Sequence, residues 1–280
     1  MKKIFFLLLI LLFILSACTS ADMSIHEESS EFNKEKSIID LDSLTIDQDS
    51  TYISLSKNDV SGYNRWVPFY FVLQGNDSCS ESAVEEELGE KIKSIKLLSE
   101  DNKTIFSTSE LIWSAFKLPG GTFNLSLVVV PECGNLGNAE IVTVNSPELL
   151  VEGNKTISYS LNSYVIEERD TLSDDYSYIS MSTMDTTYTE DLTALVDYGF
   201  YMTNGEKIAS IQIDYPQNFS DIREYEILEI EKRSEKEHIF TIAYHFSNAN
   251  PKTMFRPFIR VIYENGQTGW LVPPLPAFIN

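Results

Sequence analysis

Short apolar runs separated by polar residues recur along the chain from about residue 37. The runs are rich in Ile, Val, Phe, Tyr and Thr, which is typical of β-strands bounded by turns. In the first half we expect strands at residues 37–45, 52–56, 66–74, 93–98, 103–107, 122–130, 141–145 and 156–165. In the second half we expect them at 178–182, 199–203, 208–214, 225–231, 239–246, 258–264 and 268–272. This pattern predicts an all-β fold.

The expected strands divide into two groups, each close in size to a β-sandwich of about 100 residues. An acidic stretch without periodicity, residues 168–175, separates the groups. We therefore predict two tandem β-sandwich domains, immunoglobulin-like or similar, at residues 37–167 and 168–280. A single β-domain of about 230 residues is the alternative.

Three dipeptides predict hairpin turns between these strands. They are Asp101-Asn102, Asn204-Gly205 and Asn265-Gly266. Asn and Gly tolerate the positive φ that tight hairpins require, so we expect the strands on either side of each dipeptide to pair.

Two short helices are expected to interrupt the strands. Ser82 and Glu85 have the spacing of a capping box, and Gly89 suits a helix C-terminus. The second helix is expected at residues 189–196, where three aliphatic side chains fall on one helical face.

The first residues of the chain have the pattern of an export signal. Lys2 and Lys3 precede an apolar run of twelve residues, Ile4–Leu15. Twelve helical residues span about 18 Å, which is short of the ~30 Å hydrocarbon core of a bilayer. We therefore interpret the run as the apolar region of a signal peptide.

The run ends at Leu15-Ser16-Ala17-Cys18, which resembles the lipobox of bacterial lipoproteins. The resemblance covers residues 1–18 only and implies cleavage before Cys18, whose sulfur would carry a diacylglycerol and whose amine would be acylated. It divides the N-terminus into a signal peptide at 1–17 and a lipid-anchored flexible tether at 18–36. It also implies export and anchoring to the bacterial cell membrane or outer membrane. Cleavage as an ordinary secretory signal, for example after Ala21, is the alternative.

The charge of the chain limits its partners. The net charge is −21, and removal of two lysines with the signal leaves 19 basic against 42 acidic residues, or −23. Such a body lacks the basic surface that nucleic-acid binding requires, so we expect no nucleic-acid partner. Anionic lipid headgroups also repel such a body, so the lipid anchor alone must attach the protein to the membrane.

Besides Cys18 the chain has two cysteines, Cys79 and Cys133. Because an even number of cysteines remains once Cys18 is assigned to lipidation, an exported protein is expected to join the two by a disulfide. Each follows the end of an expected strand, at residues 74 and 130, so a bridge requires both strand ends to lie at the same end of a sandwich. Two free thiols are the alternative.

Few residues have the pattern of a catalytic site. The only histidines are His26, His238 and His245, and no metalloprotease, nucleophile-elbow or phosphate-loop motif is present. We expect no enzyme activity, no cofactor and no metal site. The expected role is a non-catalytic binding or structural one in the cell envelope, with an envelope protein or a glycan as partner.

Two other functions remain as alternatives. A carbohydrate-binding module would use exposed aromatic rings, and the candidates are Trp66, Trp113, Trp270 and Tyr201. A hydrolase of envelope or extracellular polymers would use a carboxylate pair assembled by the fold. The apolar C-terminus, residues 270–280, is expected to pack along the domain edge, or else to act as an exposed docking tail.

The lipobox yields a direct test. Replacement of Cys18 by alanine removes the acylated sulfur, so we expect the protein to move from the membrane pellet to the soluble fraction after cell fractionation. The matched control is Cys79→Ala, which leaves the lipobox intact and should stay in the pellet. Retention of the Cys18→Ala variant in the pellet would contradict the lipid anchor.

Overall fold

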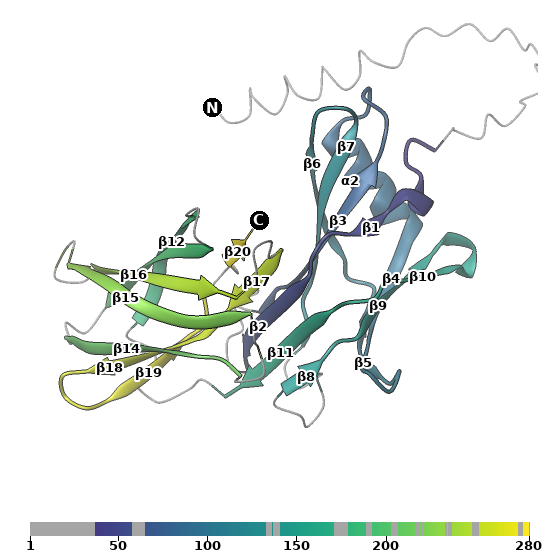
Figure 1. Ribbon diagram of the computed structural model, residues 1–280. Coiled ribbons are helices and arrows are strands. Elements are labelled where there is room, and N and C mark those ends of the chain that lie inside the picture. The colour runs from purple at the N-terminus through teal and green to yellow at the C-terminus, as the bar shows by residue number, and fades with distance from the viewer. Residues whose placement is uncertain are drawn as a thin grey trace, which may run out of the picture. The chain divides into compact units, whose positions relative to one another are not determined.

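In the computed structural model (Figure 1), β-strands make up nearly all of the regular secondary structure of the described residues. The strands form several antiparallel sheets arranged as tandem β-sandwiches, which confirms the predicted fold class. The structure describes residues 37–57, 65–132, 136, 141–170, 179–188, 192–202, 207–216, 219, 221–232, 234, 237–247, 252–273 and 277–279. The predicted signal peptide and tether lie outside these residues. Within them, no helix is long and apolar enough to cross a membrane.

Two four-stranded antiparallel sheets form the first sandwich, with strand orders β1-β3-β7-β6 and β10-β9-β4-β5. The strands of the first sheet are β1 (Thr45–Ile46), β3 (Val67–Gln74), β6 (Ile112–Lys117) and β7 (Thr122–Val129). Those of the second are β4 (Ile92–Leu98), β5 (Thr104–Thr108), β9 (Ser146–Val151) and β10 (Thr156–Ser158). The helical elements of the described chain are α2 (Glu81–Lys91), η1 (Leu41–Ser43) and η3 (Glu152–Asn154).

The second sandwich has a four-stranded sheet, β12-β13-β16-β15, and a three-stranded sheet, β14-β18-β19. The larger sheet contains β12 (Ile179–Tyr188), β13 (Thr193–Met202), β15 (Ile222–Lys232) and β16 (Glu237–Phe246). The smaller one contains β14 (Ile208–Asp214), β18 (Phe258–Tyr263) and β19 (Thr268–Leu271).

A fifth sheet, the central sheet, takes its strands from both halves of the chain. Its order is β20-β17-β2-β11-β8, and its strands are β2 (Ser50–Ser56), β8 (Ile141–Thr143), β11 (Ser163–Arg169), β17 (Thr253–Arg256) and β20 (Ala277–Ile279). In Figure 1, β2 lies between β11 and β17, and both of these neighbours run parallel to it. The predicted boundary at residue 168 falls inside β11.

The two faces of the central sheet contribute to two different hydrophobic cores. Ile53 and Ile166 lie in the N-terminal core, which the first sandwich surrounds, whereas Tyr52 and Val165 lie in the C-terminal core of the second sandwich. Alternation along each strand sends neighbouring side chains to opposite faces. All seven residues of β2 are buried, as expected for a parallel strand that is covered on both sides.

Helix α2 covers the edge of its sheet along β6. The carboxylate of Glu85 accepts a hydrogen bond from the backbone N–H of Ala115 at 2.7 Å, and that of Glu81 accepts from the N–H of Lys117 at 2.8 Å. These N–H groups face outward because β6 is the last strand of the sheet. The helix thus satisfies backbone donors that could otherwise recruit another strand.

The predicted limits of this helix are wrong by a few residues. The N-cap is Ser80, whose hydroxyl accepts a hydrogen bond from Ala83 N, rather than Ser82. The helix also continues through Gly89 to Lys91. Val84 and Leu88, which are four residues apart, are its buried positions and anchor it to the N-terminal core.

Several local expectations for the secondary structure are wrong, among them the strand at 37–45, where the structure has the helical turn η1. Residues 193–196 begin β13 and are not helical. The strands that flank Asn204-Gly205, β13 and β14, belong to different sheets and form no hairpin. The expected strand at 156–165 divides into β10 and β11, while β6, β9, β17 and β20 were not expected.

The other two hairpins are confirmed. Asn102, with a φ of 58°, closes the turn between β4 and β5. Gly266, with a φ of 86°, closes the turn between β18 and β19. At the C-terminus, β20 pairs antiparallel with β17 at the edge of the central sheet, which agrees with packing along the domain rather than with a free tail.

The shared sheet predicts that both cores unfold together. We expect Ile53→Ala to destabilise the protein by about 2–5 kcal/mol, because Ile53 is fully buried in β2. Fluorescence of variants that retain only Trp113 or only Trp270 should report the same urea midpoint for both halves. Ile112→Ala is the control, since Ile112 is 47% exposed and its loss should change stability by less than about 0.5 kcal/mol. Separate midpoints for the two probes would refute the coupling.

Candidate functional site

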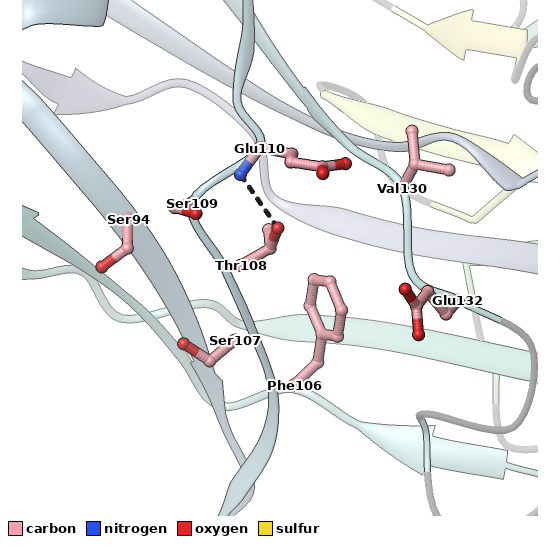
Figure 2. Close-up of a pocket in the computed structure, with 8 residues that line it drawn as sticks. All are labelled: Ser94, Phe106, Ser107, Thr108, Ser109, Glu110, Val130 and Glu132. Atoms are coloured by element: carbon pink, nitrogen blue, oxygen red, sulfur yellow. Dashed lines mark hydrogen bonds between the residues drawn. The ribbon is translucent and has the colours of Figure 1, made fainter.

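A polar groove lies along β5, the edge strand of its sheet. It has a volume of about 460 Å³ and is lined by Ser94, Phe106, Ser107, Thr108, Ser109, Glu110, Val130 and Glu132. These residues come from β4, from β5 and the turn that follows it, and from the segment after β7. We call this feature the β5 groove (Figure 2).

The backbone of β5 and its following turn orients the lining side chains. Phe106 is buried, and its ring lies on the same side of the strand as Val130, Glu110 and Glu132 in Figure 2. The N–H of Glu110 donates a hydrogen bond to the hydroxyl of Thr108 at 3.0 Å, which holds the turn at the end of the strand. The two carboxylates, which are 22 residues apart in sequence, thereby line one groove.

The lining determines which ligands the β5 groove suits. Four lining residues carry hydroxyls, two are glutamates and none is basic. The volume lies in the range of small-molecule sites, about 300–1,000 Å³, but such sites are usually apolar. A ligand here would be held mainly by hydrogen bonds to oxygen atoms, and the carboxylates would disfavour an anionic one. No single motif in the sequence indicates this groove, because its parts come from two different sheets and meet only when the sandwich forms.

The sequence-predicted aromatic candidates do not line the β5 groove. Trp66, Trp113 and Trp270 are each half-buried, and Tyr201 lies in β13. Trp113 packs against Phe71 of the N-terminal core, with ring centroids 5.9 Å apart. The structure therefore does not present the three tryptophans as fully exposed rings.

Trp270 belongs to a cluster of charged and aromatic side chains beside the C-terminal core. The guanidinium groups of Arg169 and Arg260 lie over its ring, at 5.7 and 5.6 Å from the centroid. Arg169 is also 4.7 Å from the ring centroid of Phe258. Because cations already occupy positions over the indole, Trp270 packs as a cation–π partner rather than as an open stacking platform.

Ion pairs hold Arg169 in this position. It pairs with Glu167 and with Asp214, and the hydroxyl of Tyr52 donates to the other oxygen of Glu167 at 2.7 Å. Burial, reinforced by the negative charge of Glu167, raises the pKa of Tyr52 far above its ordinary value. The cluster links β2, β11 and β14, which are distant in sequence, and therefore has no sequence signature.

The expected bridge between Cys79 and Cys133 finds no support in the structure. Cys79 is a buried free thiol that donates to the carbonyl of Ile38 at a sulfur–oxygen distance of 4.0 Å. Cys133 lies outside the described residues.

The strands that precede the two cysteines run in opposite directions. In the ladder of β3 and β7, Gln74 pairs with Thr122 and Val67 with Val129. The strands are antiparallel neighbours, so their C-terminal ends lie at opposite ends of the sheet, roughly 23 Å apart for seven strand steps. The geometric requirement that the sequence interpretation set for the bridge is not met.

The two histidines of the described residues, His238 and His245, do not come together in a site. His238 and His245 lie near opposite ends of β16, opposite Phe200 and Thr193 of β13. His245 Nδ1 is 3.0 Å from the hydroxyl of Thr193. Within the described part of the chain, no group of three His, Cys, Asp or Glu side chains has the arrangement of a metal site.

Comparisons with known proteins do not identify a family. No family model and no curated protein matches the chain. Among solved structures, a marsupial T cell receptor matches 82% of this chain and 98% of its own, at 7% identity and a TM-score of 0.22. A conserved domain protein from Bacillus anthracis matches 79% of this chain and 84% of its own, at 8% identity and a TM-score of 0.24. Similarity at this level carries no argument about function.

The free thiol of Cys79 predicts the result of thiol counting. Besides Cys18, whose sulfur is expected to be acylated, the chain carries Cys79 and Cys133, and both should react with a maleimide-polyethylene glycol in urea without prior reduction. Two additions per chain, seen as two mass steps on a gel, are expected. Cys79→Ala should show one step. Additions that occur only after treatment with a reductant would demonstrate a disulfide.

Proposed function

We propose that this chain is a membrane-anchored envelope lipoprotein with a non-catalytic binding role, and that the β5 groove holds its ligand. The observation that carries the proposal is the groove's lining of hydroxyls and carboxylates without a basic side chain. The lipobox resemblance supports the anchor, and the polar residues 18–36 would keep the folded body at a distance from the membrane.

The ligand class follows from hydrogen-bonding chemistry. Hydroxyl groups both donate and accept, whereas carboxylates only accept. A polyhydroxylated ligand offers matching groups at short intervals, and amino groups on it would pair with Glu110 or Glu132. We therefore propose a neutral or amine-bearing glycan of the cell envelope as the ligand. This version of carbohydrate binding does not depend on the half-buried tryptophans.

One observation favours hydrolysis as a second candidate function. Glu110 and Glu132 line the same groove, and glycoside hydrolysis requires two carboxylates around one bond. Both glutamates are exposed, however, and a general acid of this type normally gains a raised pKa from an apolar environment. Binding without turnover therefore fits the groove better.

The proposal predicts binding that depends on the groove glutamates. On an array of bacterial envelope glycans, wild type should give a signal, and Glu132→Gln should weaken it about 10-fold or more. A hydrogen bond to a charged group is worth about 1.5–3 kcal/mol, which corresponds to that change. Glu86→Gln, an exposed glutamate of α2, is the matched control and should bind as wild type does.

Two outcomes would count against this function. Absence of any glycan signal for wild type would remove carbohydrate binding. Shortening of the bound glycan over time, lost in both Glu110→Gln and Glu132→Gln, would establish the hydrolase instead.

A further inference from the structure

Arg256 is a fully buried arginine with most of its donors unused. It is the last residue of β17, and its side chain has no solvent exposure. Its Nε donates to the carbonyl of Ser54 at 3.1 Å, but neither Nη1 nor Nη2 has a hydrogen-bond partner among the residues that the structure describes. Because the two Nη atoms carry four N–H groups, the end of this side chain presents an unsatisfied cluster of donors.

Position on the central sheet explains where these donors point. Along β17, Met254 lies in the N-terminal core and Phe255 in the C-terminal core. Alternation therefore directs Arg256 to the same face as Met254. Arg256 is also opposite Ile53 of β2, another residue of the N-terminal core.

Arg65, a second buried arginine, differs from Arg256 because its guanidinium has hydrogen-bond acceptors. Arg65 is 4% exposed and donates to the backbone carbonyls of Pro131, Ser56 and Glu132. It also forms an ion pair of 2.7 Å with Glu168, which is 1% exposed. All three of its nitrogen atoms have acceptors.

Counted over the described residues, the charges of this buried region do not balance. It contains two guanidinium groups, and the positive charge of Arg65 disfavours a second cation nearby. Glu168, the buried carboxylate on the same face of β11, pairs with Arg65 through Oε1, and its single negative charge balances only one of the two guanidinium groups. Burial lowers the pKa of Arg256 to about 9, so its guanidinium is still charged at pH 7.

We propose that the Nη end of Arg256 is an internal binding site for a small monovalent anion of the halide class. A halide supplies the missing negative charge. It can accept hydrogen bonds from several N–H groups at once, because a spherical ion imposes no preferred hydrogen-bond direction. Water could accept two of these hydrogen bonds, but it would leave the charge uncompensated. A phosphate would require more volume and a larger desolvation cost inside a close-packed core.

The site is structural and independent of the β5 groove. An anion at this position binds the folded protein and not the unfolded chain, so it must stabilise the fold as its concentration rises. Because Arg256 is fully buried, exchange of the anion requires a local opening of the central sheet.

Halide-dependent thermal unfolding tests the proposal. The purified protein is heated at constant ionic strength while sodium gluconate is replaced by sodium chloride or bromide. A rise of about 2–4 °C is expected once the halide is several times its dissociation constant, and it should continue to grow with the logarithm of the halide concentration. Arg256→Met should abolish the rise, and Arg256→Lys should retain a smaller one. Arg223→Met is the matched control, because Arg223 is 66% exposed and should leave the rise unchanged.

A crystallographic experiment decides the case even if the Met variant fails to fold. Crystals of wild type soaked in bromide should show an anomalous peak within hydrogen-bond distance of Arg256 Nη1 and Nη2. An unchanged melting temperature in halide, together with no such peak, would mean that only water binds the Nη atoms of Arg256. That result would overturn the proposal. A halide response that persists in Arg256→Met would overturn it as well.

Discussion

The structure depends on a single strand, β2, whose backbone is paired with a strand on each side and whose side chains are all buried. β2 has parallel neighbours on each side, β11 from the middle of the chain and β17 from near its end. One face packs into the N-terminal core and the other into the C-terminal core. A strand in this position has no solvent-facing side, so each of its side chains must suit one core or the other. The two sandwiches are therefore joined by a shared sheet instead of a flexible linker.

Burial on both faces also explains why charged groups occur where the halves meet. Glu167 and Glu168 are adjacent on β11 and point to opposite faces, and each is less than 3% exposed. Glu168 pairs with Arg65 on one face, while Glu167 pairs with Arg169 and Tyr52 on the other. Buried carboxylates are tolerated only with such partners, so the pairs help to hold β11 in register against β2. Arg256 is the exception that leaves a charge to be balanced.

The sequence predicted the strands that alternate or carry long aliphatic runs, such as β3, β7 and β16, because burial of one face produces a local pattern. It did not reveal β17, whose four residues end in a charged arginine, or β6, whose exposed Ile112 and Phe116 alternate with half-buried residues. The helix expected at 189–196 failed because leucines and valines suit a buried strand as well as a helical face. The β5 groove could not be predicted from the sequence for another reason. Glu110 and Glu132 line one groove only when two sheets of the sandwich come together.

Parallel pairing of β2 with β17 has a consequence for the order of folding. Ser54 and Pro257, which are joined by a hydrogen bond, are 203 residues apart in the chain. Loop closure over such a distance is slow, and proteins dominated by contacts of this kind fold slowly. During synthesis β2 can pair with its second neighbour only after residues 253–256 have been made. Until then one edge of β2 has unpaired backbone N–H and C=O groups, which could pair with another chain. Pairing with β17 covers this edge.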